Sequence, residues 1–243
     1  MPVSASRALI VVPAFNEGRG VHDVVLEIRD AMGDAADCLV IDDGSSDDTA
    51  AEARRAGALV ARLPVNLGVG GALRTGFVYA RDEGYTALVQ VDADGQHDPR
   101  YVPDMLRRLE HADIVVGARF AGEGDYAVRG PRQWAMRVLS HLIRAVTGYR
   151  LTDTTSGFKA CGPRAIALFA EHMPAEYLGD TVEALVIASR AGCRVEQLPV
   201  AMRDRTHGTP SQSPAKAAKY LMRAVMAVTV ATMRPAPRVG VAR

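Results

Sequence analysis

Cysteine, net charge and long apolar runs are all scarce in this sequence of 243 residues. Cys38, Cys161 and Cys193 are too few and too scattered for a disulfide framework or a zinc site, so we expect a reducing compartment. The formal net charge of +1 gives no overall field that would attract a nucleic acid, so we expect no nucleic-acid partner. No apolar stretch reaches the roughly 18 residues of a bilayer-spanning helix, and no signal peptide is visible before Leu9.

A regular alternation of two patterns fills most of the chain. Short apolar runs rich in β-branched residues predict strands, and apolar residues spaced three and four apart predict helices. The predicted strands are 8–12, 38–41, 59–63, 87–91, 114–117 and 194–202. The predicted helices are 21–32, one beginning at Thr49, 70–83, 99–109, 134–146, 180–191 and 216–233. This alternation predicts an α/β fold whose mainly parallel sheet is covered by helices on both faces.

The alternation changes after Arg119, where segments 121–132 and 203–214 are rich in glycine, proline and charge and are predicted to be loops. We expect residues 1–212 to form the α/β domain and residues 213–243 to form an amphipathic helix and tail. The apolar run 224–233 has basic flanks and is too short to span a bilayer. It suits an anionic membrane surface or a small membrane partner, and equally a helix packed on the domain.

Carboxylates follow three predicted strands at the point where each strand ends. Glu17 follows the first strand, Asp42 and Asp43 follow the second, and Asp92 and Asp94 follow the fourth. The carboxyl ends of parallel strands meet at one edge of a sheet, where ligands bind in open α/β sheets. Like charges gathered there repel one another unless cations neutralise them. Each acid alone is typical of a turn or helix cap, but their joint placement predicts a nucleotide and metal site.

The run 88–97 carries the motif around which these acids are arranged. An apolar strand ends in Asp92 and Asp94, and Gln96 offers a third oxygen two residues later. Such hard oxygen ligands suit Mg²⁺ or Mn²⁺, which bind substrate phosphates. A polar turn uses the same residue types, so the motif alone leaves both interpretations open. The glycine-rich segment 66–71 lacks a full dinucleotide fingerprint and is predicted to be a helix-entry loop.

Seven motifs together resemble those of family 2 glycosyltransferases with the GT-A fold, and within that family the dolichol- and polyprenol-phosphate sugar synthases. They are V-P-A-F-N-E at 12–17, I-D-D-G-S-S-D at 41–47, N-L-G at 66–68, D-A-D-G-Q-H at 92–97, G-A-R-F at 117–120, D-T-T-S-G-F-K at 153–159 and R-T-H-G at 205–208. They occur in order over roughly residues 8–212. The resemblance implies transfer of a sugar from a nucleotide-sugar donor to polyprenyl phosphate, at the inner face of the cytoplasmic membrane.

The resemblance also implies roles for individual residues. Those expected to line the nucleotide are Pro13, Phe15, Glu17, Asp42, Asp43 and Gly68. Asp92, Asp94 and Gln96 would hold Mg²⁺ or Mn²⁺ against the donor diphosphate. The expected phosphate-binding arginines are Arg119 with either Arg132 or Arg137 for the acceptor, and Arg205 for the diphosphate. Guanidinium groups match phosphate oxygens, and a metal with an arginine stabilises a departing nucleoside diphosphate. Loops 121–132 and 203–214 are expected to order on donor binding.

The class of acceptor decides whether the reaction needs a base. A lipid phosphate is anionic near neutral pH, whereas a sugar hydroxyl requires a general base. Asp180 is the candidate base for a hydroxyl acceptor, with Glu183 one turn further on, and a helix cap is the competing interpretation of Asp180. The expected acceptor-binding arginines, Arg119 with Arg132 or Arg137, favour the phosphate acceptor. Direct in-line attack by that phosphate would invert the configuration at the anomeric carbon. The alternatives are a transferase acting on a carbohydrate hydroxyl and an inactive nucleotide-sugar-binding or scaffold subunit.

Two features depart from the family pattern. Relatives often have Ser-Lys after the glycine of the Arg-x-x-Gly loop, but Thr209 and Pro210 follow Gly208 here, which puts a lysine contact to the donor in doubt. Many relatives also have C-terminal membrane helices, and some instead rely on a separate small membrane subunit, which we expect as a partner. The C-terminal loop and helix resemble actinobacterial members such as polyprenyl-phospho-N-acetylgalactosaminyl synthases. The expected donor is a UDP- or GDP-sugar, since acids such as Glu17 and Asp43 can bond either base, and UDP-N-acetylhexosamine is favoured.

Overall fold

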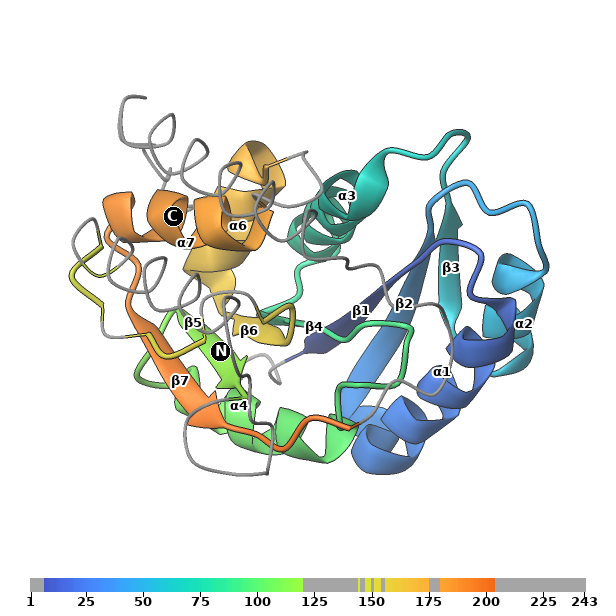
Figure 1. Ribbon diagram of the computed structural model, residues 1–243, viewed down its shortest axis with the longest axis horizontal. Helices are drawn as coiled ribbons and strands as arrows, with labels where there is room; N and C mark the ends of the chain where they lie inside the picture. Colours follow the sequence, from blue (N-terminus) through green and yellow to red (C-terminus); the bar gives the residue numbers. More distant parts are fainter. Residues whose placement is uncertain are drawn as a thin grey trace, which may run out of the picture.

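The computed structural model describes residues 7–119, 144, 147–149, 151–153, 156–174 and 180–203. Within these ranges, seven strands form one sheet in the order β3-β2-β1-β4-β6-β5-β7 (Figure 1). The strands are β1 (Ala8–Ala14), β2 (Ala36–Asp42), β3 (Leu59–Arg62), β4 (Ala87–Gln90), β5 (Ile114–Ala118), β6 (Lys159–Cys161) and β7 (Val195–Pro199). Strand β6 runs antiparallel to β4 and β5, and the other neighbours are parallel. The predicted α/β fold with a mainly parallel sheet is confirmed.

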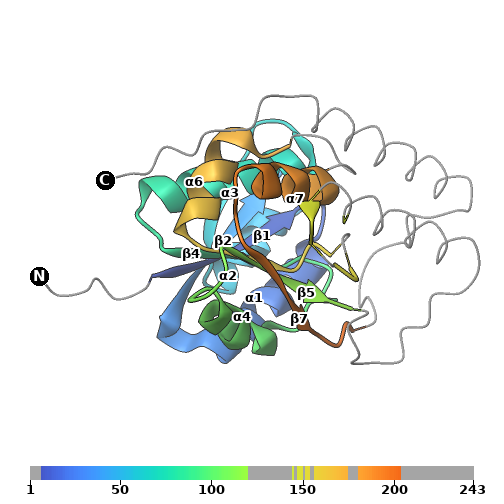
Figure 2. The same ribbon diagram turned by 90° about the vertical axis from the view of Figure 1, so that its left-hand side faces the viewer.

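Helices cover both faces of this sheet, as Figure 2 shows. The α-helices are α1 (Gly18–Met32), α2 (Thr49–Arg55), α3 (Gly68–Asp82), α4 (Val102–Arg108), α6 (Pro163–His172) and α7 (Asp180–Arg190). Helices α1, α2 and α4 share a core with one face, and α3, α6 and α7 share a core with the other. No helix in the described ranges is long and apolar enough to cross a membrane.

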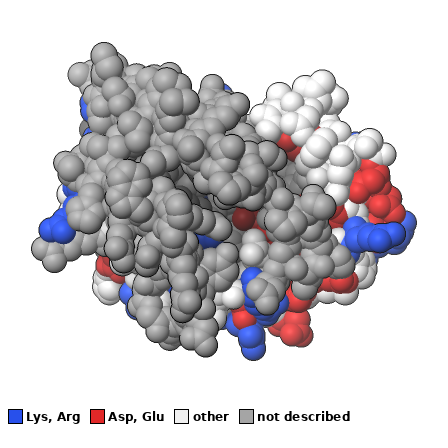
Figure 3. Space-filling model, in the orientation of Figure 1, with Lys and Arg blue, Asp and Glu red and all other residues white. Residues whose placement is uncertain are grey.

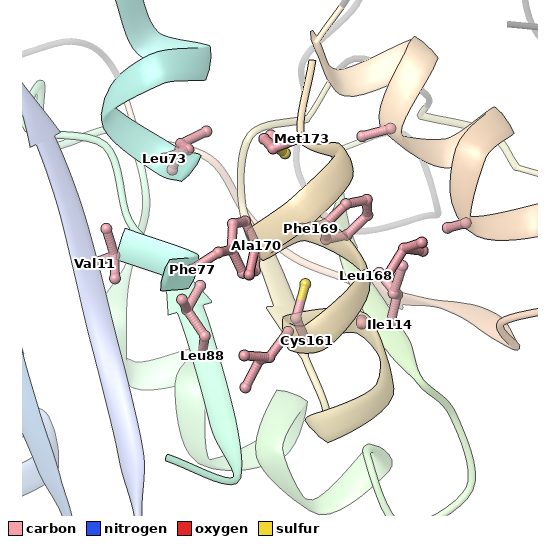
Figure 4. Packing of buried hydrophobic residues seen from close by; sticks show 14 of the residues in the cluster. Val11, Leu73, Phe77, Leu88, Ile114, Cys161, Leu168, Phe169, Ala170 and Met173 are labelled. Atoms are coloured by element: carbon pink, nitrogen blue, oxygen red, sulfur yellow. The ribbon is translucent and has the colours of Figure 1, made fainter. Parts of the chain in front are cut away.

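The two cores explain why the central strands are apolar throughout. In β1, Leu9 and Val11 pack under α3, and Ile10 and Val12 pack under α1. A strand buried on both faces has no polar alternation, which is the pattern of a parallel sheet between helices. Figure 4 shows the α3–α6 core. The ring centroids of Phe77 on α3 and Phe169 on α6 are 5.2 Å apart.

Some predicted elements differ from the observed ones. No strand or helix was predicted between the helices at 134–146 and 180–191, but Lys159, the last residue of the 153–159 motif, begins strand β6, and α6 follows. A strand of three residues is too short to show a period-two pattern, and Pro163 in the first turn of α6 reads as a loop residue although proline suits that position. The predicted helix 99–109 is a 3₁₀ turn at Pro99–Tyr101 followed by α4.

Charges of both signs lie beside one another on the described surface. Figure 3 shows acidic and basic side chains next to each other at the α1–α2 end of the molecule. Arg55 pairs with Glu52 on α2, and Arg107 pairs with Asp104 on α4. Exposed pairs of this kind contribute little to stability.

The strand order places a topological switch between β1 and β4. From β1 the chain continues outward to β2 and β3, and helix α3 then returns it to β4 on the other side of β1. The register pairs Ala14 with Asp42 and Val11 with Gln90, so the carboxyl ends of β1, β2 and β4 are neighbours. Ligands of open α/β sheets bind in the crevice at such a point.

Candidate functional site

The loops after β1 and β2 are joined by hydrogen bonds. The amide of Asn16 donates to Ser45 Oγ at 2.9 Å, and the amide of Ser46 donates to Asn16 Oδ1 at 2.9 Å. The amide of Gly18 donates to Asp47 Oδ2 at 3.1 Å. Asn16 has a φ of 54°, a left-handed conformation that asparagine tolerates better than most residues. The two loops therefore form one connected edge at the carboxyl end of the sheet.

The carboxylates of Asp42 and Asp43 are both held by protein groups. Asp42 Oδ1 accepts from the amide of Ser45 at 2.9 Å, and its Oδ2 lies 3.2 Å from Arg62 Nε. Asp43 Oδ1 accepts from the amide of Leu67 at 2.8 Å. Asp42 thus stabilises its own turn, and Asp43 connects that turn to the segment before α3.

The Asp43 contact fixes the helix-entry loop beside the predicted nucleotide site. Burial raises the pKa of Asp43 above its ordinary value, although hydrogen bonds from the amides of Leu67 and Gly68 act in the opposite direction. Gly68 has a φ of 79°, which favours glycine, and α3 begins there. The loop that was predicted from its glycines is therefore anchored by a residue of the β2 end.

Apolar side chains are exposed at this same end of the sheet. Phe15 is 48% exposed, and Val65 and Leu67 are exposed as well. Pro13 and Glu17 are partly exposed. An exposed aromatic ring offers a flat face for stacking, which is a common way for proteins to hold a planar base.

The Asp92–His97 turn holds its own two carboxylates. Gln90 Nε2 donates to Asp92 Oδ1 at 3.0 Å, and the amide of Asp92 donates to His97 Nδ1 at 3.0 Å. Asp94 Oδ1 accepts from the amide of Gln96 at 3.0 Å. Because His97 Nδ1 accepts a hydrogen bond, we assign the ring proton to Nε2, which lies 3.6 Å from Asp92 Oδ2. The turn is thus built to orient Asp92 and Asp94.

Two residues from the β6 side support this turn. Phe158 stacks on the ring of His97, with ring centroids 4.9 Å apart. Gly157 lies against Asp92 so closely that a Cβ there would be 2.9 Å from Gln90 Nε2 and 3.0 Å from Asp92 Oδ2. A side chain at 157 would therefore require the Gln90 amide and the Asp92 carboxylate to shift.

The donor set at this turn fits a divalent metal bound together with phosphates. In the described ranges, no group of three His, Cys, Asp or Glu side chains is placed to hold a metal ion. Mg²⁺ does not need such a group, because it is usually bound by one or two carboxylates, substrate phosphates and water. The Asp92 side chain is 36% exposed, so its carboxylate is accessible from solution. The oxygens of Asp92, Asp94 and Gln96 are of the hard type that Mg²⁺ and Mn²⁺ prefer.

Arg119 forms a two-point ion pair with a fully buried carboxylate. Its Nε donates to Asp153 Oδ2 at 2.7 Å, and its Nη2 donates to Asp153 Oδ1 at 3.1 Å. Gln197 Nε2 donates to the carbonyl of Asp153 at 3.1 Å, which connects this pair to β7. The charge of the predicted acceptor-binding arginine is thus balanced within the protein.

Arg203 connects the end of the described chain to the Asp92–His97 turn. Its amide donates to the carbonyl of Gln96 at 3.1 Å, and its Nη2 lies 3.0 Å from Asp98 Oδ1. Its Nη1 donates to Glu27 on α1. The segment that precedes Arg205 is therefore fixed beside the carboxylate turn.

Residues 9–167 carry a family signature that agrees with this geometry. The model for glycosyl transferase family 2 matches residues 9–167. The chain belongs to this family. Among its relatives is an undecaprenyl-phosphate mannosyltransferase of Micrococcus luteus, 31% identical over 215 residues, which are 85% of this chain and 88% of the relative. A UDP-N-acetylglucosamine–dolichyl-phosphate N-acetylglucosaminyltransferase of Methanococcus voltae is 26% identical over 211 residues, 79% of this chain and 83% of the relative.

Solved structures of the same fold include a glucosyl-3-phosphoglycerate synthase from Mycobacterium tuberculosis. Its complex with Mn²⁺, uridine diphosphate and glucosyl-3-phosphoglycerate matches with a TM-score of 0.73 and 20% identity, covering 96% of this chain and 82% of that one. This likeness confirms the GT-A fold.

Several residues that the family resemblance singles out lie outside the described residues. These are Arg132, Arg137, Arg205 and the helix and tail at 213–243. Helix α7 begins at Asp180, whose side chain is also outside the described part, so its roles as base and as cap both stay predictions.

The structure brings together predicted and unpredicted residues of this glycosyltransferase. The carboxyl ends that carry Glu17, Asp43 and Asp92 lie at neighbouring strands, as the parallel arrangement predicted. The residues that sequence analysis missed as site components are His97, Asp98, Asp153, Gly157 and Arg203. Most of them stand inside or directly beside quoted motifs, but which motif residue contacts which is a three-dimensional fact.

Proposed function

We propose that this glycosyltransferase moves a sugar from a nucleotide-sugar to polyprenyl phosphate with inversion at the anomeric carbon, for cell-envelope glycan synthesis. The observation that carries the proposal is the Asp92–Asp94 turn at the switch between β1 and β4, where Gln90 and His97 orient Asp92. The names of the Micrococcus and Methanococcus relatives, which contain undecaprenyl phosphate and dolichyl phosphate, support the choice of acceptor.

On the donor side, Asp92, Asp94 and Gln96 would hold Mg²⁺ or Mn²⁺ against the diphosphate. The metal, when bound, neutralises negative charge on the departing nucleoside diphosphate. The nucleotide would lie on the connected loops after β1 and β2, with Phe15 beside the base and Asp43 fixing the loop that includes Gly68. The remaining proposed nucleotide contacts are Pro13, Glu17 and Asp42.

On the acceptor side, the lipid phosphate is itself the nucleophile and requires no general base. One of its oxygens forms a bond to the anomeric carbon while the bond from that carbon to the diphosphate breaks, and the electron pair leaves with the nucleoside diphosphate. Attack opposite the leaving group inverts the configuration. Arg119, with Arg132 or Arg137, stays a proposal for positioning this phosphate, and Arg205 for neutralising the diphosphate.

We further propose that the donor is UDP-N-acetylhexosamine and that the enzyme works at the inner face of the cytoplasmic membrane. The name of the Methanococcus relative includes UDP-N-acetylglucosamine, which supports testing this donor first. Residues 213–243 would contact the membrane surface or a small membrane-embedded partner, because basic residues flank the apolar run 224–233.

The test is transfer of labelled sugar to lipid by the full chain with Mn²⁺ and polyprenyl phosphate. A panel of UDP- and GDP-sugars is offered, and organic-phase label is counted. We expect acid-labile lipid label from one donor, and Asp94→Ala to lose it. An Asp180→Asn variant separates the hydroxyl-acceptor alternative, since near-complete loss of turnover in a folded variant would favour Asp180 as a base. Donor binding without any turnover would favour an inactive binding subunit.

A further inference from the structure

Lys159 is a buried basic residue without a partner in the described part of the chain. It is 6% exposed, although lysine is rarely buried unless it is paired. Among the residues that the structure describes, none forms a hydrogen bond or ion pair with its Nζ. Because no charged group in the described part of the chain pairs with Lys159, a role in ligand binding explains its presence better than a role in stability does.

Lysine is also an unusual choice in this sequence. The chain has lysine only at 159, 216 and 219, and every other basic residue apart from histidine is arginine. Arginine forms two-point pairs with carboxylates, as Arg119 does with Asp153, whereas an ammonium is a compact point charge. Lys159 therefore does not belong to a lysine-rich surface, and its site differs in kind from the arginine pairs around it.

The register of β6 places Lys159 on the α3–α6 face of the sheet. It pairs with Gln90 on β4 and with Val116 on β5. The next pair along the same face is Cys161 with Leu88, which lies in the core under α3 and α6 (Figure 4). Since side chains alternate along a strand, Lys159 lies on the same face, one step nearer the carboxyl end of β4.

That position lies between the two charged groups of the site. Strand β6 separates β4, which leads to Asp92, from β5, which leads to Arg119. Gln90, the partner of Lys159, donates to the Asp92 carboxylate at 3.0 Å. Gly157, two residues before Lys159, lies against the same carboxylate. Lys159 is therefore the basic residue of the strand between the metal-binding turn and the Arg119–Asp153 pair.

An anionic acceptor would gain from a further cation at this position, beside the arginines proposed above. Asp92, Asp94 and the donor diphosphate gather negative charge, which a phosphate acceptor must approach. The charge of Arg119 is already balanced by the fully buried Asp153. We infer that the ammonium of Lys159 binds the phosphate of polyprenyl phosphate and positions it for attack, an inference that rests on the proposed function. Lysine binds phosphate as a point charge, and no carboxylate in the described ranges forms an ion pair with Lys159.

The experiment measures KM for polyprenyl phosphate and for the donor separately, with the full chain in Mn²⁺. Lys159→Met removes the charge and keeps the length, and Lys159→Arg keeps the charge. For Lys159→Met we expect the lipid KM to rise about 10-fold or more, because a hydrogen bond to a charged group is lost, with the donor KM changed less than about 2-fold. Lys159→Arg should recover part of the lipid affinity. The Tm of Lys159→Met should stay close to that of the wild type, because no hydrogen bond or ion pair of Nζ with the described residues is lost.

Cys161→Ala is the matched control, since Cys161 lies on the same strand and face, is also buried and is one step further from the site. It should leave both KM values unchanged. If the wild type transfers sugar to lipid and Lys159→Met has an unchanged lipid KM, or if its Tm falls and both KM values rise together, the inference about Lys159 is wrong while the proposed function stands. If the wild type labels no lipid with any donor, the proposed function and this inference fail together.

Discussion

Two buried carboxylates near the site have pKa values shifted in opposite directions, and each shift has an identifiable cause. Burial raises the pKa of Asp43, and this outweighs the amide hydrogen bonds from Leu67 and Gly68. For Asp98, burial acts in the same direction, but hydrogen bonds from Arg100 and the charge of Arg203 outweigh it, so its pKa lies below the ordinary value. Ionisation of Asp43 therefore lowers the stability of the folded protein, and ionisation of Asp98 raises it.

Asparagine variants of these residues should respond to pH with opposite signs. The unfolded-state pKa of aspartate is about 3.9. The folded-state pKa of Asp43 lies above this value, so the wild type loses stability as pH rises from the unfolded-state pKa through the folded-state pKa. Asp43→Asn does not titrate there, so its Tm should rise relative to that of the wild type between pH 3.5 and pH 7. Since the folded-state pKa of Asp98 lies below the unfolded-state value, Asp98→Asn should lose Tm relative to wild type over the same range. Thermal unfolding measured across pH tests both, and two parallel profiles would contradict the assignment.

Gly157 is a second residue-scale test, because its missing side chain makes room for the Asp92 carboxylate. A Cβ at 157 would lie 3.0 Å from Asp92 Oδ2. We expect Gly157→Ala to weaken Mn²⁺-dependent nucleotide binding by about 10-fold, because Gln90, which orients the Asp92 carboxylate, must shift, and disturbing such a supporting partner of a metal ligand typically costs about that much. Isothermal titration with UDP and GDP measures this. Gly162→Ala is the control, because its Cβ would meet nothing closer than 3.6 Å, and equal losses in both variants would contradict the account.

At the element scale, the Arg119–Asp153 pair fixes the segment before β6 to the end of β5. Asp153 is fully buried, and removing one partner of such a pair leaves an uncompensated charge. Asp153→Asn should lower the free energy of unfolding by about 3 kcal/mol at neutral pH. Chemical denaturation measures this. Asp104→Asn, which breaks the exposed pair with Arg107, should change it by about 0.5 kcal/mol or less, and an equal effect of the two variants would contradict a buried structural pair.

The elements that the sequence predicted best are those whose burial is continuous. The strands around Ile10, Val40 and Val89 are buried apolar segments that contain β-branched residues, a pattern that favours strands over helices. Strand β6 has no such run, because a lysine opens it and its pairing with β4 and β5 depends on residues about 70 and 45 positions earlier in the chain. The local sequence pattern therefore does not predict the pairing of β6 with β4 and β5.

At the scale of the whole molecule, β4 separates two groups of strands that carry different candidate site residues. The side with β1, β2 and β3 carries the connected loops and the exposed Phe15, which suit a nucleotide. The side with β6, β5 and β7 carries Lys159 and the Arg119–Asp153 pair. The Asp92 turn stands between them, where we propose that the donor diphosphate and the acceptor phosphate meet. The proposed reaction would therefore have its donor, metal and acceptor in this order along the edge of the sheet.

The same scale shows how far sequence alone could predict the site. The strand ends bearing Glu17, Asp43 and Asp92 could be predicted to converge, because parallel strands share an edge. That Arg119 is balanced by Asp153, and that His97 orients Asp92, could not, because these contacts join segments through side-chain geometry that no periodicity encodes.

The most direct test of the central claim compares two acceptors that differ only in the phosphate. The full chain, Mn²⁺ and the labelled donor panel are incubated in parallel with polyprenyl phosphate and with the corresponding polyprenol. We predict label in the lipid fraction with polyprenyl phosphate only, and its loss when Mn²⁺ is removed by chelation. Label on polyprenol, or transfer only to a water-soluble hydroxyl acceptor, would contradict an enzyme whose nucleophile is a lipid phosphate.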